Sequence, residues 1–194
     1  MDAYARAREL IDAAHGHDPQ RTAAGRPAEL VYADRVEAWV LRLQPDAPPR
    51  MRLAARCQHL ERWSVPRTSF PAGQAGYLAW RKLLYQRQAD RARTLLRQAG
   101  APAAEAEDVA TWVSKRGLRT NVGTRALEDA ACLVFLEHEL AAFAARHADY
   151  PRQKLVAILR RTWRKMSPPA QAFARTLPLP PAIAGLVREA RGAP

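Results

Sequence analysis

The sequence predicts an all-α protein, and three observations support that fold class. Apolar residues recur three and four positions apart over most of the chain, which places one apolar face along each helix. Sustained alternation of apolar and polar residues is absent, and so are the Asn-Gly and Asp-Gly pairs of tight hairpins. The 15 prolines fall mainly between the periodic stretches, so we expect helices joined by short and medium loops.

The first two predicted helices are separated by a loop rich in helix breakers. Residues 3–14 carry an apolar stripe that includes Ile11, and the loop HGHDPQRTAAGRP follows. A second helix begins near Pro27, because the fixed φ of proline suits the first helical turn. Its apolar stripe includes Val36 and Val40, and the turn QPDAPP ends it.

A third helix is predicted over residues 49–63, with Leu60 on its buried face. The stretch SVPRTSFPAGQAG cannot continue it, because prolines interrupt the helical hydrogen bonds. A long fourth helix is predicted over residues 75–99, and Gly100 closes it as a C-cap residue.

The rest of the chain is predicted to contain three more helices and a proline-rich tail. The helices are expected at 103–115, 124–147 and 151–166. The tail from Ser167 contains two short helical pieces whose apolar residues need a surface to cover. We therefore predict a single orthogonal helical bundle over residues 1–166, with a C-terminal tail, residues 167–194, packed on it.

The net charge of +12 favours an anionic partner, either a phosphorylated small molecule or a nucleic acid. Arginine supplies almost all of the 31 basic residues, which is also the surface composition of proteins from GC-rich genomes. Charge alone is therefore weak support for nucleic-acid binding, and an anionic small molecule is the first expectation.

No apolar run approaches the roughly 20 residues that span a bilayer, and the N-terminus lacks the apolar core of a secretory signal. We expect a cytoplasmic protein that makes no membrane contact. Cys57 and Cys132 both fall within helical patterns and are expected to be buried and reduced.

His59 is the first candidate for chemistry. On a helix over residues 49–63, Arg62 at i+3 and Trp63 at i+4 would share its face, and Arg67 follows nearby. Histidine can bind a metal, transfer a proton near neutral pH or bind phosphate. A histidine hydrogen-bonded within the core is the alternative.

Glu128 and Asp129 are the second candidates, because they fall in the first turn of the helix predicted over residues 124–147. Carboxylates there stabilise a helix through its dipole. The alternative is that Asp129 binds a metal or orients His59, which requires the two side chains to lie within a few ångströms of each other.

The segment FPAGQAGYLAWRKLL and the segment LRRTWRKMSPP are further candidates. The first places Tyr77, Trp80 and Arg81 near a helix start, where free N–H groups can bind an anion, although the aromatic residues equally suit a core. The second carries Arg160 and Arg161 on a basic face, which is either solvated or contacts a phosphate backbone.

Residues 29–63 resemble the opening of the HD-domain superfamily, all-helical metal-dependent phosphohydrolases. Tyr32 takes the slot of that superfamily's first histidine, Gln58 and His59 take those of its His-Asp pair, and Asp129 resembles its final aspartate. The resemblance implies a degenerate metal site, with His59 and Asp129 as the ligands of a divalent Mn, Fe or Zn ion.

A second resemblance covers most of residues 29–168. The segments LAARCQHLERWSVPR, FPAGQAGYLAWR, LEDAACLVFLEHE and RRTWRKMSP are similar to the family of domain of unknown function 4202, which implies no activity.

These observations predict a binder or hydrolase of a phosphorylated small molecule, in the first instance a nucleotide. His59 would be a metal ligand or general acid/base, with Asp129 as its partner. Arginines would bind phosphate oxygens and aromatic residues would line the pocket, namely Arg62, Arg67, Arg81, Trp63, Tyr77 and Trp80. The alternative is a non-catalytic scaffold that binds RNA or a protein through arginine-rich faces.

Overall fold

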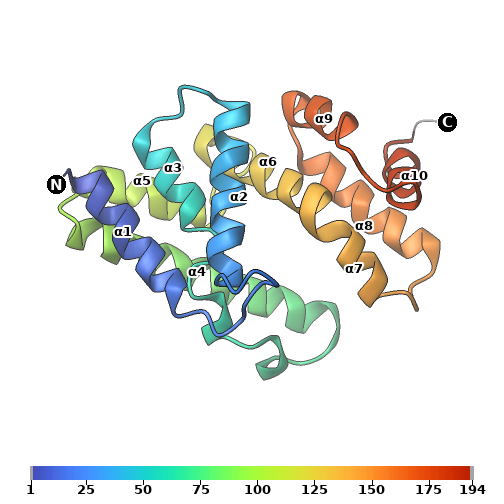
Figure 1. Cartoon of the computed structure of the whole chain (residues 1–194), viewed down its shortest axis with the longest axis horizontal. Coiled ribbons are helices and arrows are strands. Elements are labelled where there is room, and N and C mark those ends of the chain that lie inside the picture. The colour runs from blue at the N-terminus through green and yellow to red at the C-terminus, as the bar shows by residue number, and fades with distance from the viewer. Residues whose placement is uncertain (1, 193–194) are drawn as a thin grey trace. The chain divides into compact units, whose positions relative to one another are not determined.

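The chain folds into α-helices, as predicted (Figure 1). The computed structural model describes residues 2–192, and within them the only β-type pairing is an isolated bridge between Arg21 and Pro27. The elements are α1 (Ala3–Gly16), α2 (Ala28–Leu43), α3 (Pro49–Arg56), η1 (Arg62–Ser64), η2 (Arg67–Ser69), α4 (Gly73–Gln98), α5 (Ala103–Val113), α6 (Val122–Val134), η3 (Phe135–Glu139), α7 (Leu140–Arg146), α8 (Arg152–Lys165), α9 (Pro168–Arg175) and α10 (Pro181–Ala190).

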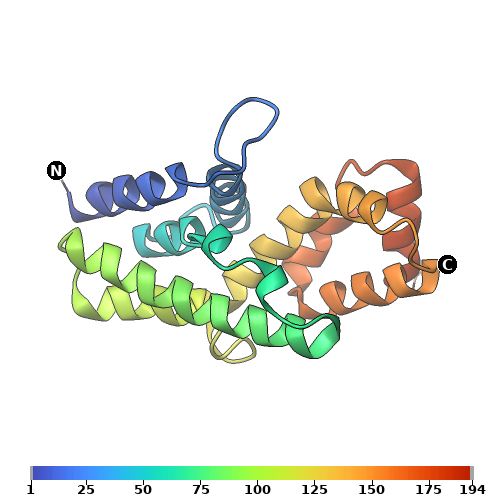
Figure 2. The same cartoon turned by 90° about the horizontal axis from the view of Figure 1, so that it is seen from below.

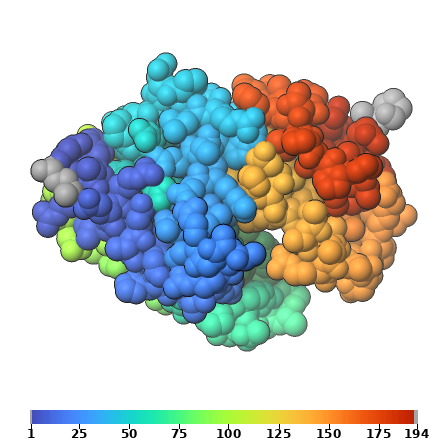
Figure 3. All heavy atoms as spheres, viewed as in Figure 1, coloured from blue at the N-terminus to red at the C-terminus, as the bar shows by residue number. Residues whose placement is uncertain are grey.

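Residue contacts divide the chain into two compact units, of which the first ends at Leu127 and the second begins at Glu128. In the first unit, α4 and α5 lie side by side, α3 packs on α2 and α5, and α1 packs on α3 and α4 (Figure 2). The helices α1 and α2 form much of the face of this unit that is visible in Figure 3. Fully buried side chains at its centre include those of Ile11, Val36, Trp39, Leu60, Leu96 and Val109.

The second unit contains the paired helices α8 and α10, together with the π-helical segment η3, which leads into α7. Its core includes Leu136, Leu140, Val156 and Leu159. The predicted division at residue 166, into a bundle and a tail, stays a prediction.

A buried arginine ties three helices of the first unit together. Arg56, at the end of α3, has only 1% of its side chain exposed. Its Nη1 donates to Asp34 Oδ1 at 2.8 Å and to Glu37 Oε2 at 2.9 Å on α2, and its Nε donates to Asp12 Oδ1 at 2.6 Å on α1. A guanidinium group is suited to this role because its five donors satisfy several carboxylates at once. α3 ends at this arginine, three residues before His59.

The predicted helix over residues 49–63 is wrong beyond Arg56. His59 and Glu61 have φ angles of +59° and +51°, in the left-handed region that ends a right-handed helix. Arg62 and Trp63 instead belong to the short turn η1. His59 therefore does not share a helix face with Arg62 and Trp63, and a turn presents it.

The predicted helix over residues 124–147 differs at its start and in its interior. The side chain of Asn121 accepts a hydrogen bond from the Thr124 N–H at 3.0 Å, so α6 begins at Val122. Glu128 and Asp129 consequently lie in the middle of α6, and their placement in a first helical turn was wrong. The π-helical segment η3 then interrupts the α-helical hydrogen bonds.

The other predicted helices are confirmed to within a few residues. Cys57 and Cys132 are buried free thiols, as expected. Within residues 2–192 no helix is both long and apolar enough to cross a membrane.

Candidate anion-binding and acid–base site

The turn after α3 presents His59 to the start of α2. The imidazole stacks on the Tyr32 ring, with centroids 3.9 Å apart and planes 9° apart. Its Nδ1 lies 3.0 Å from Glu29 Oε2, and the His59 side chain is 25% exposed. Tyr32 is buried behind it. The imidazole is therefore held by stacking on Tyr32 and by contact with the Glu29 carboxyl group, and part of the ring remains exposed to solvent.

Arg62 contacts the same imidazole. Its Nη1 lies 3.0 Å from His59 Nε2 and 3.2 Å from Nδ1, and its guanidinium carbon lies 4.9 Å from the centre of the Trp80 ring. A guanidinium only donates hydrogen bonds, so His59 can accept one from it only through an unprotonated ring nitrogen. We infer the neutral tautomer in which Nδ1–H donates to Glu29 and Nε2 accepts from Arg62.

The surroundings favour a neutral His59. Burial lowers the pKa of His59 well below its ordinary value, and the positive charges of Arg62, Arg81 and Lys115 lower it further. Burial also raises the pKa of Glu29 to about 7, an effect that the charge of Arg62 only partly offsets. The Glu29 carboxyl thus gains and loses its proton near neutral pH, while His59 stays uncharged.

Arg81 adds a second guanidinium close to His59. It donates to the Tyr77 hydroxyl at 2.9 Å and to the Tyr85 hydroxyl, and both partners are uncharged acceptors. Within residues 2–192, neither Arg62 nor Arg81 forms an ion pair with a carboxylate. Two positive charges near a neutral histidine therefore have no protein counter-charge in direct contact.

The structure brings together some of the predicted site residues. Arg62 contacts both His59 and Trp80. The Tyr77 ring lies 6.0 Å from the Trp80 ring, centre to centre, and Tyr77 in turn contacts Arg81, so the five residues form one cluster. The indole N–H of Trp80 donates to the Val65 carbonyl at 2.9 Å, so this ring is a buried wall.

Three predicted residues lie elsewhere or have another role. Arg67 donates to the carbonyls of Phe70 and Gly73, so it braces the loop before α4. Trp63 is partly buried in η1. Asp129 belongs to the second unit, where it accepts a hydrogen bond from the Ser167 N–H at 2.7 Å. Its pairing with His59 stays a prediction.

A profile of the family described as a domain of unknown function, DUF4202, matches residues 5–187. The chain belongs to this family. No curated protein and no solved structure matched the sequence.

Sequence reasoning about this DUF4202 chain missed Glu29, which is the carboxylate that contacts His59 within the first unit. A signal was present, because Glu29 and Tyr32 are three residues apart on α2 and so share a helix face. Asp18, in the loop between α1 and α2, supports the same segment. Its carboxylate accepts a hydrogen bond from the Glu29 N–H at 2.9 Å and thereby fixes the start of α2.

The groups that contact His59 in this DUF4202 chain are a poor match to the ligands of a divalent metal ion, and the expected metal site with Asp129 stays a prediction. Among residues 2–192 no group of three or more His, Cys, Asp or Glu side chains is arranged to hold one. At His59 the ring nitrogens are engaged by Glu29 and Arg62, and three cationic side chains lower its pKa. A metal needs several converging lone pairs, and nearby positive charges oppose it. The same charges suit an anion.

Proposed function

We propose that the first unit binds a phosphorylated small molecule, in the first instance a nucleotide, beside His59. The observation that carries the proposal is an imidazole in contact with a carboxyl group and a guanidinium, with a second guanidinium nearby that lacks a carboxylate partner. A phosphate group would supply the missing negative charge to Arg62 and Arg81, because planar guanidinium groups bind phosphate oxygens in pairs. Tyr77, which is 41% exposed, is available to stack on a base.

We further propose that His59 and Glu29 act as the acid–base pair of a phosphate-ester hydrolysis. Once Arg62 turns to the phosphate, His59 Nε2 is free to accept a proton from an attacking water. The water oxygen bonds to phosphorus, the ester P–O bond breaks, and the imidazolium returns the proton to the departing oxygen. Glu29 would accept the Nδ1–H hydrogen bond throughout and stabilise the transient positive charge.

Binding and turnover should respond to different variants. Titration calorimetry with AMP, ADP and pyrophosphate should show binding to the wild type, and Arg62→Gln should weaken it by roughly ten- to a hundredfold, since hydrogen bonds to charged groups are the strong ones. The control Arg6→Gln removes an exposed charge from α1 and should change affinity by less than about twofold.

Hydrolysis of the same nucleotides and of p-nitrophenyl phosphate tests the acid–base pair. His59→Gln should lower the rate roughly a hundredfold or more with little change in affinity, because general acid–base catalysis contributes about 10²–10⁴-fold. No binding of any of these compounds to the wild type would end the proposal. If the compounds bind but are not hydrolysed, the proposed binding site stands and the proposed hydrolysis is contradicted.

A second candidate function rests on α8. Arg160, Arg161 and Arg164 are all exposed on this helix, and within residues 2–192 none of them forms an ion pair. This face suits the phosphate backbone of RNA, as the sequence also suggested.

A further inference from the structure

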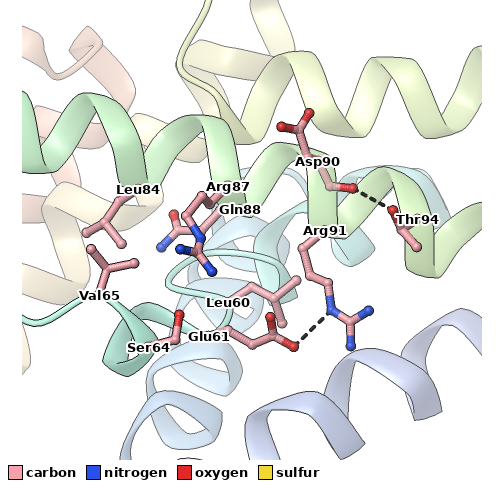
Figure 4. Close-up of a pocket in the computed structure, with 10 residues that line it drawn as sticks. All are labelled: Leu60, Glu61, Ser64, Val65, Leu84, Arg87, Gln88, Asp90, Arg91 and Thr94. Carbon is pink, nitrogen blue, oxygen red and sulfur yellow. Dashed lines mark hydrogen bonds and ion pairs between the residues drawn. The ribbon is translucent and has the colours of Figure 1, made fainter.

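A pocket of about 300 Å³ lies in the first unit between α4 and the turn over residues 60–65 (Figure 4). Its apolar wall is formed by Leu60, Val65 and Leu84, which are all buried. The volume is at the lower end of the range found for small-molecule sites, and such sites combine apolar walls with a few polar groups.

One polar group in this pocket lacks a partner. Gln88 is only 4% exposed, and its amide Nε2 has no hydrogen-bond partner among the described residues. In Figure 4 the Gln88 side chain reaches from α4 towards the turn that carries Val65 and Ser64. Buried polar groups are nearly always hydrogen-bonded, because leaving a donor unpaired costs free energy. A ligand that brings an acceptor oxygen would remove that cost.

Several polar neighbours of Gln88 already have partners. Glu61 pairs with Arg91 at 2.9 Å across the edge of the pocket. The Asp90 carboxylate accepts hydrogen bonds from Gln86 and Arg93, and the Thr94 hydroxyl donates to the Asp90 carbonyl. Among the residues that line the pocket, only Gln88 has a buried side-chain nitrogen or oxygen without a partner.

The charge of the lining limits the ligand. Two carboxylates, Glu61 and Asp90, and two guanidinium groups, Arg87 and Arg91, line the pocket, so its formal charge is zero. A multiply charged phosphate would gain little from such a lining, in contrast to the cationic surroundings of His59. An uncharged or singly charged molecule fits better.

We propose that this pocket binds a small molecule with a carbonyl or carboxylate oxygen and an apolar body of a few carbon atoms. The oxygen accepts the hydrogen bond of Gln88 Nε2, and the body packs on Leu60, Val65 and Leu84. This site is separate from the proposed nucleotide function and does not depend on it.

Ligand-observed NMR with butyramide, butyrate and butyl phosphate as probes tests the assignment on the full chain. Butyramide and butyrate should bind, and Gln88→Met should weaken both by roughly tenfold, because it removes the donor and keeps the volume. The control Gln98→Met changes an exposed glutamine at the end of the same helix and should leave both affinities unchanged.

Further measurements make failure recognisable. Gln88→Met should melt at the same temperature as the wild type or higher, since an unpaired buried donor has been removed. Gln88→Glu should lose affinity for butyrate, because the two carboxylates repel each other, and should lose less affinity for the uncharged butyramide. Arg62→Gln should leave butyramide binding intact, so loss of the nucleotide site is distinguishable from loss of this one. The proposal is overturned if neither butyramide nor butyrate binds, if Gln88→Met binds both as the wild type does, or if butyl phosphate is preferred.

Discussion

Glu29 is the residue whose charge state matters most near neutral pH. It lies against His59 at the start of α2, and its folded pKa of about 7 is well above its ordinary value of 4.5. The folded state therefore holds this proton more tightly than the unfolded state between those pH values. Stability from Glu29 is fully present below pH 4.5 and is lost as the pH rises through about 7.

Glu29→Gln should remove this pH dependence, because the amide cannot ionise but its oxygen can still accept the Nδ1–H of His59. The variant should gain stability relative to the wild type between pH 5 and pH 8, by up to about 3 kcal/mol from the size of the pKa shift. Denaturant unfolding at several pH values measures the difference. The lowered pKa values of His59 and His15 destabilise both proteins in acid and so largely cancel.

The exposed Glu9 on α1 gives a matched control. Glu9→Gln should change the free energy of unfolding by about 0.5 kcal/mol or less, because the side chain is exposed. If Glu29→Gln behaves in the same way, then the carboxyl of Glu29 is solvated and the inferred His59 tautomer loses its basis.

Among the helices, α4 depends on a close approach that only glycine permits. A Cβ added at Gly76 would overlap the backbone carbonyl of Pro71, which cannot move aside as a flexible side chain could. Gly76→Ala should therefore destabilise the protein by roughly 1–3 kcal/mol, since overpacking outweighs the helix propensity gained, about 1 kcal/mol. Gly16→Ala in α1 meets no atom within 4 Å and should be neutral or slightly stabilising. Thermal and denaturant unfolding of both variants measures these changes. If the two variants change stability equally, the loop at Pro71 moves to accommodate the added Cβ.

The helices could be predicted from the sequence where periodicity and breakers agree, and the errors have local physical causes. The segment RCQHLERW contains good helix formers and no glycine or proline, so nothing in it predicts the left-handed backbone conformation of His59 and Glu61. The end of α3 coincides with the burial of Arg56 against carboxylates of α1 and α2, which a single sequence does not display.

The candidate site was predictable only in part for the same reason. Residue types marked His59, Arg62, Trp80 and Arg81, but the contact with Glu29 depends on how the turn after α3 meets α2. Tertiary placement, rather than any local pattern, selected that carboxylate.

For the whole molecule, the net charge of +12 makes association with polyanions the main competing property. Binding to RNA by neutralisation of phosphates weakens linearly with the logarithm of salt concentration, by a slope of about 0.7 for each contact on a single strand. Nucleotide binding beside His59 involves two arginines and should depend less steeply on salt. The two readings therefore differ in slope as well as in ligand.

A triple variant, Arg160→Gln, Arg161→Gln and Arg164→Gln, separates them. If the exposed face of α8 binds RNA, the slope measured with a single-stranded oligonucleotide should fall by about 2, because three phosphate contacts are lost. AMP affinity should stay the same, since His59, Arg62 and Arg81 are untouched. Fluorescence anisotropy from 50 to 300 mM salt gives both quantities. An unchanged slope would exclude α8 as a binding surface for polyanions. The net positive charge would then be a property of the solvated surface in general.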